Sequence, residues 1–342
     1  MNCNETFKKD KSNSLIKVSS IFLILIIILV LLTLISIGLG SARYSITEIL
    51  KALFNNESSP VKTIVLKLRI PRVISAIIIG SLLATSGALL QAVMKNPLAD
   101  PGTIGISAGA MTSASTVILL LPSLLKYLPL FAFLGSALAC FLIYSVAWKK
   151  GIDPLRIILS GVAINSVLGA YNSLLQMLNA NNLETVLTFI NGSLSGMGWF
   201  KVRQISVSAV IGLTLSLLCI KSANILQLGD DTAKSLGVNI NLNRILLSAV
   251  AAFLAASTVY IAGIIGFVGL VVPHIARLVV GSDYKIMLPV SMVLGSIILL
   301  IADTVGRIIV PNMEIPVGIV MAVLGGPFFL YLLKRRGKYN GN

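Results

Sequence analysis

Long runs of apolar residues, each close to twenty residues in length and separated by short polar stretches, recur along the whole chain. The first run, Ile21 to Gly40, contains no charged residue and follows a lysine-rich stretch at residues 8–17. A helix of about 20 apolar residues spans the roughly 30 Å hydrocarbon core of a bilayer. We therefore predict a retained membrane-spanning helix here, because the apolar run is too long for a cleaved signal peptide.

Further apolar segments follow a polar stretch at Ser41 to Arg72, and they lie near residues 73–93, 103–122, 128–148, 157–177, 204–220, 245–266, 267–280, 286–305 and 316–333. This pattern predicts an all-α, polytopic membrane protein with about ten transmembrane helices. We expect a cytoplasmic N-terminal tail at residues 1–18, a transmembrane domain at 19–334 and a cytoplasmic C-terminal tail at 335–342.

The segment at 267–280 differs from the others because it is short and contains Pro273. Interrupted helices in membrane proteins usually line a path, since their exposed backbone groups need protein or water as partners. We expect this segment to be a broken helix.

The composition supports a membrane protein. Hydrophobic residues make up 56% of the chain and charged residues only 11%, whereas soluble domains carry about 25% charged residues. The three cysteines are scattered without the spacing of metal ligands or redox pairs, so we assign them no chemistry.

Basic residues are distributed unevenly. With the N-terminus in the cytoplasm, most of the 27 Lys and Arg residues fall on the inside, as the positive-inside rule requires. Six nevertheless crowd into the first outer stretch: Arg43, Lys51, Lys62, Lys67, Arg69 and Arg72. An acidic partner outside the cell would account for this patch, and contact with lipid headgroups or water is the simpler alternative.

A faint internal repeat relates the segment from Arg72 to Pro101 to the segment from Arg244 to Pro273, with the same offset at both ends. The two segments enter the membrane from opposite sides in our topology. This is the arrangement of an inverted-repeat transporter.

Motifs for catalysis are missing from the sequence. No segment fits G-x-x-x-x-G-K-[ST], so we expect a transport subunit that does not itself hydrolyse ATP. The one histidine, His274, has no Cys, His or carboxylate partner at ligand spacing, which favours a packing or capping role. We expect no metal site and no cofactor in this chain.

Several motifs in fixed order resemble the FecCD-type permeases of iron-siderophore and cobalamin ABC importers. The residues that carry the resemblance extend over nearly the whole chain: Arg69-Ile-Pro-Arg72, Gly80, Gly87, Gln91, Asn96-Pro-Leu-Ala-Asp-Pro101, Gly105, Gly109, Gly161, Asn165, Asn191-Gly-Ser-Leu-Ser-Gly196, Trp199, Gly263-Ile-Ile-Gly-Phe-Val-Gly-Leu-Val-Val-Pro-His-Ile-Ala-Arg277, Pro289, Gly295, Ala302-Asp303, Arg307, Glu314-Ile-Pro-Val-Gly318 and Gly325-Gly-Pro-Phe328.

This resemblance implies an ABC importer permease in the bacterial cytoplasmic membrane. It implies three kinds of partner: a second permease subunit, two cytoplasmic ATPase subunits and an extracytoplasmic substrate-binding protein. In such permeases, arginines on the outer face meet glutamates of the binding protein. Arg69, Arg72 and Arg307 stand at the matching positions, in agreement with the outward basic patch.

The resemblance also implies a coupling element and a path for the cargo. Short helices between Asn224 and Asn241 would dock into the ATPase, through Leu228, Gly229, Ala233, Leu236 and Gly237; alternatively, Gly237 merely ends a helix in a surface loop. Pro273 to Asp283 is a second candidate contact. The fifth helix, near Asn165 and Asn172, would line the path.

Other functions stay open at this stage. An ion-coupled secondary transporter would bury an acidic residue as its coupling site, and Asp303 is the one candidate, although pairing with nearby Arg307 is the simpler account. A membrane-embedded enzyme would need clustered His, Asp and Glu. The cargo is expected to be an iron complex, an Fe(III)-siderophore before haem or cobalamin, and the permease pair is a homodimer or a heterodimer.

Overall fold

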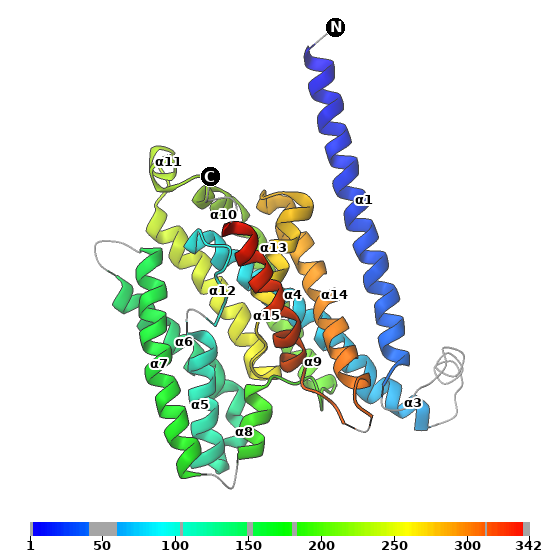
Figure 1. Ribbon diagram of the computed structural model, residues 1–342, viewed down its shortest axis with the longest axis vertical. Coiled ribbons are helices and arrows are strands. Elements are labelled where there is room, and N and C mark those ends of the chain that lie inside the picture. The colour runs from blue at the N-terminus through cyan, green and yellow to red at the C-terminus, as the bar shows by residue number, and fades with distance from the viewer. Residues whose placement is uncertain are drawn as a thin grey trace.

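The structure is a computed structural model that describes residues 3–40, 60–102, 105–148, 153–179, 183–311 and 313–337, and these form a bundle of helices (Figure 1). The elements are α1 (Cys3–Gly38), α3 (Pro60–Ile64), the π-helix η1 (Val65–Arg69), α4 (Ile70–Met94), α5 (Ile106–Leu120), the 3-10 helix η2 (Pro122–Tyr127), α6 (Leu128–Ala147), α7 (Pro154–Leu178), α8 (Leu183–Ile190), α9 (Trp199–Leu218), α10 (Ile220–Gln227), α11 (Asp230–Ser235), α12 (Ile240–Ala262), α13 (Val268–Val280), α14 (Tyr284–Ile308) and α15 (Val317–Gly337).

Within the described part of the chain, ten apolar helical segments correspond to the ten predicted from the sequence. Seven are long and apolar enough to cross a bilayer, and they are Val18–Gly38, Pro60–Met94, Pro122–Ala147, Pro154–Leu178, Trp199–Leu218, Ile240–Ala262 and Tyr284–Ile308. Three shorter apolar helices lie at Ile106–Leu120, Val268–Val280 and Val317–Tyr331. The all-α, polytopic fold is therefore confirmed.

One segment differs from the prediction. The apolar stretch at 103–122 forms a helix only from Ile106 to Leu120, and 15 residues extend roughly 22 Å, short of the hydrocarbon core. The backbone explains this, because Gly105 adopts a left-handed conformation (φ 74°) at the start of α5 and separates the helix from the preceding loop. The segment at 267–280 is short as predicted, but it is not broken at Pro273: α13 runs continuously from Val268 to Val280 with this proline inside it.

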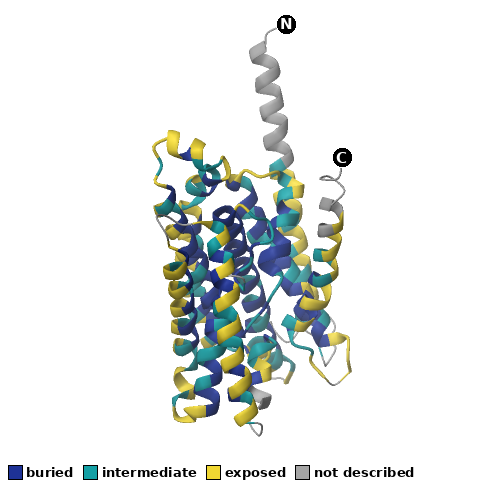
Figure 2. Ribbon diagram, turned by 60° about the vertical axis from the view of Figure 1, so that its left-hand side comes forward, coloured by how far each residue is buried: buried dark blue, intermediate teal, exposed yellow. Residues whose placement is uncertain are grey.

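The centre of the bundle is α4, which is buried along most of its length and packs against α14, α12, α13 and α9. Small residues allow these contacts. A Cβ atom on Gly80 would lie 2.2 Å from the carbonyl oxygen of Gly295, so α4 and α14 cross with their backbones in contact. Figure 2 shows the buried residues inside and exposed residues on the outer helices, and Phe141 of α6 and Leu174 of α7 are examples of these exposed apolar side chains.

The predicted repeat related Arg72–Pro101, which holds most of α4 and the loop after it, to Arg244–Pro273, which holds most of α12 and the start of α13. Each long helix is followed by a loop and a short helix, of 15 residues in α5 and 13 in α13. Lys95 follows the end of α4 and Arg244 lies at the start of α12, yet both bind Asp230. The two long helices therefore run in opposite directions, as an inverted repeat requires.

Candidate functional site

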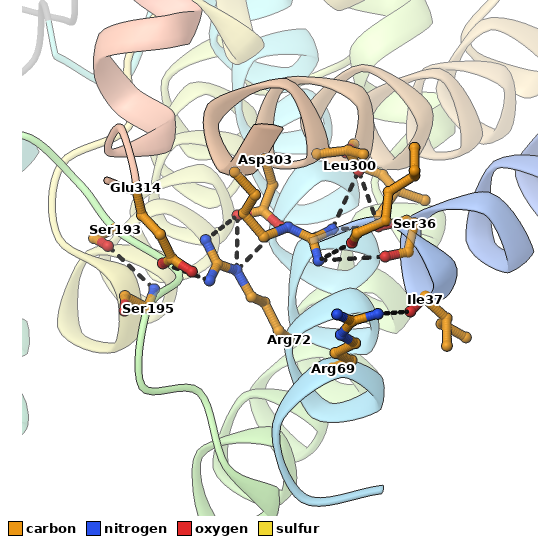
Figure 3. A network of polar contacts seen from close by, with 12 residues as sticks. Ser36, Ile37, Arg69, Arg72, Ser193, Ser195, Leu300, Asp303 and Glu314 are labelled. Carbon is orange, nitrogen blue, oxygen red and sulfur yellow. Dashed lines mark hydrogen bonds and ion pairs between the residues drawn. The ribbon is translucent and has the colours of Figure 1, made fainter. Parts of the chain in front are cut away.

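Arg72 and Arg307 meet around the buried carboxylate of Asp303 at one end of the bundle. Figure 3 shows Arg72 beside Asp303 and Glu314. Arg72 Nε and Nη2 each lie 3.0 Å from Asp303 Oδ1, and Arg307 Nε lies 3.2 Å from Asp303 Oδ2. Arg72 Nη1 also donates to Glu314 Oε2 at 2.8 Å. The side chain of Asp303 is 1% exposed, so this carboxylate is engaged by protein groups rather than by solvent.

Arg69 and Arg307 hold the end of α1. Arg69 Nη1 donates to the carbonyl oxygens of Ile37 and Gly38, at 2.7 and 2.9 Å. Arg307 donates to the carbonyl oxygens of Ser36 and Leu39 and to the hydroxyl of Ser36. The last carbonyls of a helix have no partner within the helix, and guanidinium groups satisfy them here.

The three arginines proposed for docking are thus brought together, as the sequence suggested, but they differ in access to solvent. Arg69 and Arg307 are 7% and 5% exposed and face inward, whereas Arg72 reaches the more exposed Glu314. Their contact with a binding protein stays a prediction. Arg43 and Lys51, which belong to the same basic patch, lie outside the described residues.

The sequence left two roles for Asp303, an ion-coupling site or an ion pair with Arg307, and the ion pair is confirmed. The structure adds Arg72 as a second partner 231 positions away in sequence. A buried carboxylate whose two oxygens already contact two arginines is poorly suited to take up and release a coupling ion, because its binding capacity is occupied by protein groups. This argues against an ion-coupled secondary transporter.

At the opposite end of the bundle, α10 and α11 form a projecting element beside α4 and α12 (Figure 1). Leu228 and Leu236 are both 59% exposed, whereas Ala233 is fully buried. Gly229 and Gly237 have positive φ angles of 103° and 72°, which glycine adopts without strain. All five residues named from the sequence therefore lie on one compact element with two leucines at its surface.

The alternative interpretation of Gly237, a helix stop, is confirmed, whereas its contact with an ATPase stays a prediction. Its N–H donates to the carbonyl oxygen of Lys234, and the N–H of Val238 donates to that of Ala233, at 2.9 and 3.2 Å. These two hydrogen bonds form a Schellman motif. Gly237 can therefore end α11 while the neighbouring Leu236 stays exposed at the surface.

Asp230, which the sequence analysis did not name, attaches α11 to the bundle. Its carboxylate accepts from Lys95 Nζ at 2.5 Å and from Arg244 Nη2 at 3.0 and 3.1 Å. Burial by itself would raise the pKa of Asp230, but the hydrogen bonds and charges of Lys95 and Arg244 outweigh it and hold the pKa below its ordinary value. The sequence did contain a signal for this residue, because an acidic residue directly after a glycine is typical of the first turn of a helix.

A second attachment joins α10 to the start of α14. Asn224 Nδ2 donates to Asp283 Oδ1 at 2.7 Å, and Asn224 Oδ1 accepts from the N–H of Tyr284 at 2.9 Å. Two hydrogen bonds to the carboxylate lower the pKa of Asp283: the larger effect comes from the backbone N–H of Lys285 and the smaller from the side chain of Asn224. Pro273 to Asp283, the second candidate contact, therefore ends beside α10.

The two asparagines of α7 lie in different surroundings. Asn165 lines a cavity of about 420 Å³ together with Asp100, Gly102 and Phe267, and its Nδ2 donates to the carbonyl oxygen of Gly102 at 3.1 Å. Asn172 is 1% exposed and donates to Thr112 Oγ1 of α5. Asn165 thus faces an open space between the loops that follow α4 and α12, whereas Asn172 packs between helices.

Comparison with known proteins identifies the family. Residues 27–335 match the model of the FecCD transport family. The chain belongs to this family. Two curated relatives of FecCD type are a "Fe(3+)-citrate import system permease protein YfmD" from Bacillus subtilis, 39% identical over 315 residues that cover 92% of this chain and 94% of the relative, and a "Probable heme-iron transport system permease protein IsdF" from Staphylococcus aureus, 37% identical over 317 residues that cover 93% and 96%.

A solved structure supports the same FecCD assignment. A transporter described as being of the metal-chelate ABC type, in an inward-facing conformation, superposes with a TM-score of 0.81 at 29% sequence identity, covering 93% of this chain and 99% of that chain. The chain is therefore a multi-pass membrane permease of an ABC transporter, and its fold was correctly predicted.

Proposed function

We propose that this chain is the permease subunit of an ABC importer that carries an Fe(III) complex into the cytoplasm. The observation that carries the proposal is the FecCD family match together with relatives named for iron citrate and haem iron. An iron complex is the cargo class common to those names, and an Fe(III)-siderophore belongs to it. ATP hydrolysis takes place in a separate ATPase subunit, and this chain needs no cofactor of its own.

The end of the bundle that carries the arginines is the proposed docking face for an extracytoplasmic binding protein. Three guanidinium groups and the carboxylates of Asp303 and Glu314 leave one positive charge in excess there. Such a field steers an acidic partner and fixes its orientation more than it adds affinity. Arg72 is the contact residue, because it already binds an exposed carboxylate, while Arg69 and Arg307 position α1 and α14 around it.

The element formed by α10 and α11 is the proposed docking site for the ATPase. The half-exposed Leu228 and Leu236 supply apolar surface at a charged end of the bundle. Asp230 would pass a displacement of α11 to α4 through Lys95 and to α12 through Arg244. Since α4 and α12 are the two long helices of the inverted repeat, moving them would change access to the cavity at Asn165.

The cargo would pass between two permease subunits, a homodimer or a pair with a related chain. Asn165 is the proposed lining residue, supported by its place at the cavity with Asp100. Asn172 is a less favoured lining residue, because α5 and α7 would have to separate before its side chain could contact the cargo.

Uptake by intact cells tests this function. Cells with and without the gene would receive labelled Fe(III)-citrate, an Fe(III)-hydroxamate siderophore, haem and cobalamin. We expect loss of uptake for one iron complex, reproduced by Arg72→Glu and not by Lys126→Glu, a reversal at an exposed lysine outside the arginine cluster. Unchanged uptake of all three iron complexes, with loss of cobalamin uptake, would contradict the iron assignment.

A further inference from the structure

A polar cavity of about 310 Å³ opens at the same end of the bundle as α11. Its lining comes from α4, α10, α13 and α14 and from the segments that follow them, and its polar members are Gln91, Lys95, Asn96, Gln227, His274, Arg277, Ser282 and Tyr284. Within the described part of the chain, no carboxylate lines this cavity. The cavity is therefore rich in hydrogen-bond donors and positively charged.

Arg277, in the last turn of α13, is the central charge of this cavity. Its Nη2 donates to Gln91 Oε1 at 3.2 Å, and Tyr284 is a second hydrogen-bond partner. Both partners are neutral, and among the described residues Arg277 forms no ion pair. A guanidinium carries five N–H donors, so a partly buried one with only neutral partners retains both charge and donors for an anion.

The neutral partners of Arg277 are themselves fixed. Gln91 Nε2 faces the carbonyl oxygens of Gly269 and Leu270 at 3.3 and 3.4 Å, which orients Oε1 toward the arginine. The Tyr284 hydroxyl donates to the carbonyl oxygen of Ala88 at 2.7 Å. The guanidinium is thus held in place before any ligand arrives, which lowers the entropic cost of binding.

Lys95 adds a second cation at the rim. It adopts a left-handed backbone conformation (φ 48°), which is uncommon for a residue with a side chain. This conformation ends α4 and directs Nζ to Asp230, at 2.5 Å. An ammonium group has three donors, so one contact with Asp230 leaves others for the cavity.

We infer that this cavity receives an acidic side chain of the ATPase subunit, as an anchor separate from the apolar contact of Leu228 and Leu236. A carboxylate matches the planar donor fork of Arg277. Gln227 lines the cavity and directly precedes Leu228, so a protein that covers Leu228 also covers the opening. This inference rests on the proposed function, which supplies the ATPase.

The test is the affinity of the purified ATPase for the full-length permease in nanodiscs of neutral phosphatidylcholine. The variants are Arg277→Glu, Arg277→Gln and a matched control, Lys285→Glu, which reverses an exposed lysine at the same end outside the cavity. Thermal unfolding of each permease alone verifies that it is folded. We expect Arg277→Glu to weaken binding by about tenfold or more and the control to leave it within about twofold.

A second step identifies the partner group. Acidic residues on the permease-facing surface of the ATPase would be changed to arginine one at a time, and one of them should restore binding to Arg277→Glu. The inference is overturned if no such change restores binding, if Lys285→Glu weakens binding equally, or if the Arg277 effect appears only with anionic lipid, which would make a lipid headgroup the ligand. An ATPase that fails to bind the unaltered permease would instead contradict the proposed function and remove this inference with it.

Discussion

Arg72 and Asp303 form a buried ion pair between the start of α4 and the end of α14, with Nε and Nη2 of the arginine each 3.0 Å from one carboxylate oxygen. The same carboxylate binds Arg307 at 3.2 Å. One acidic group therefore joins the central helix to its main neighbour, and its negative charge offsets the repulsion between two cations.

Replacing Asp303 should destabilise the protein strongly. Asp303→Asn leaves two buried guanidinium groups without their carboxylate, and breaking a buried ion pair on one side costs about 3–5 kcal/mol. Glu314→Gln removes the more exposed partner of Arg72, for which a loss below about 1 kcal/mol is expected. Unfolding of both variants in detergent measures the difference, and equal losses would contradict the central role of Asp303.

The end of α1 should become mobile when Arg69 is replaced. Arg69→Met removes the donors that satisfy the carbonyl oxygens of Ile37 and Gly38. Hydrogen–deuterium exchange at the amide of Leu39, which bonds to Ile35 within the same turn, should then be several-fold faster. Lys67→Met, at an exposed position of the same π-helix, is the control, and equal exchange in the two variants would show that Arg69 does not hold α1.

A methyl group at Gly80 should force α4 and α14 apart. The added Cβ would lie 2.2 Å from the carbonyl oxygen of Gly295, a backbone atom that cannot move aside cheaply. Overpacking of this kind costs about 1–3 kcal/mol. Gly326→Ala is the matched control, because no heavy atom outside its chain neighbours and the backbone of its own helix lies within 4 Å of its Cβ position. Two variants of equal stability would show that the helices tolerate a wider separation.

The contribution of Asp230 should depend on pH. Its pKa lies below the ordinary value in the folded protein, so its carboxylate stabilises the attachment of α11 above about pH 4, and this contribution is lost as the pH falls through the lowered folded-state pKa. The difference in thermal stability between the unaltered protein and Asp230→Asn should therefore be largest near neutral pH and vanish in strong acid. A difference that does not change with pH would exclude an electrostatic role for Asp230.

The sequence predicted the fold well because the bilayer imposes a simple rule. A run of about 20 apolar residues is visible without knowledge of any partner, and the short apolar run at 267–280 indicated the short helix α13, although Pro273 does not break it. The shortening of α5 was not predicted, since apolar residues continue past Gly105 and composition does not report a left-handed backbone.

The candidate sites were predicted less completely, because long-range partners leave no local signal. Arg69 was expected to face outward, yet its acceptors are the backbone carbonyls of Ile37 and Gly38, which any residue type provides. Likewise, Asp230 attaches α11 to the end of α4 through Lys95, which lies 135 positions away in the sequence. The sequence shows which side chains carry charge. Which groups these side chains contact depends on how α1, α4 and α12 pack together.

The most direct test of the account is ATP-dependent uptake of labelled Fe(III) complexes by proteoliposomes that contain this permease, its ATPase and its binding protein. The account predicts accumulation of one iron complex that requires ATP and the binding protein, and that is reduced at least tenfold by Arg72→Glu while Lys126→Glu transports normally. Uptake that proceeds without ATP and follows a proton or sodium gradient would contradict the account.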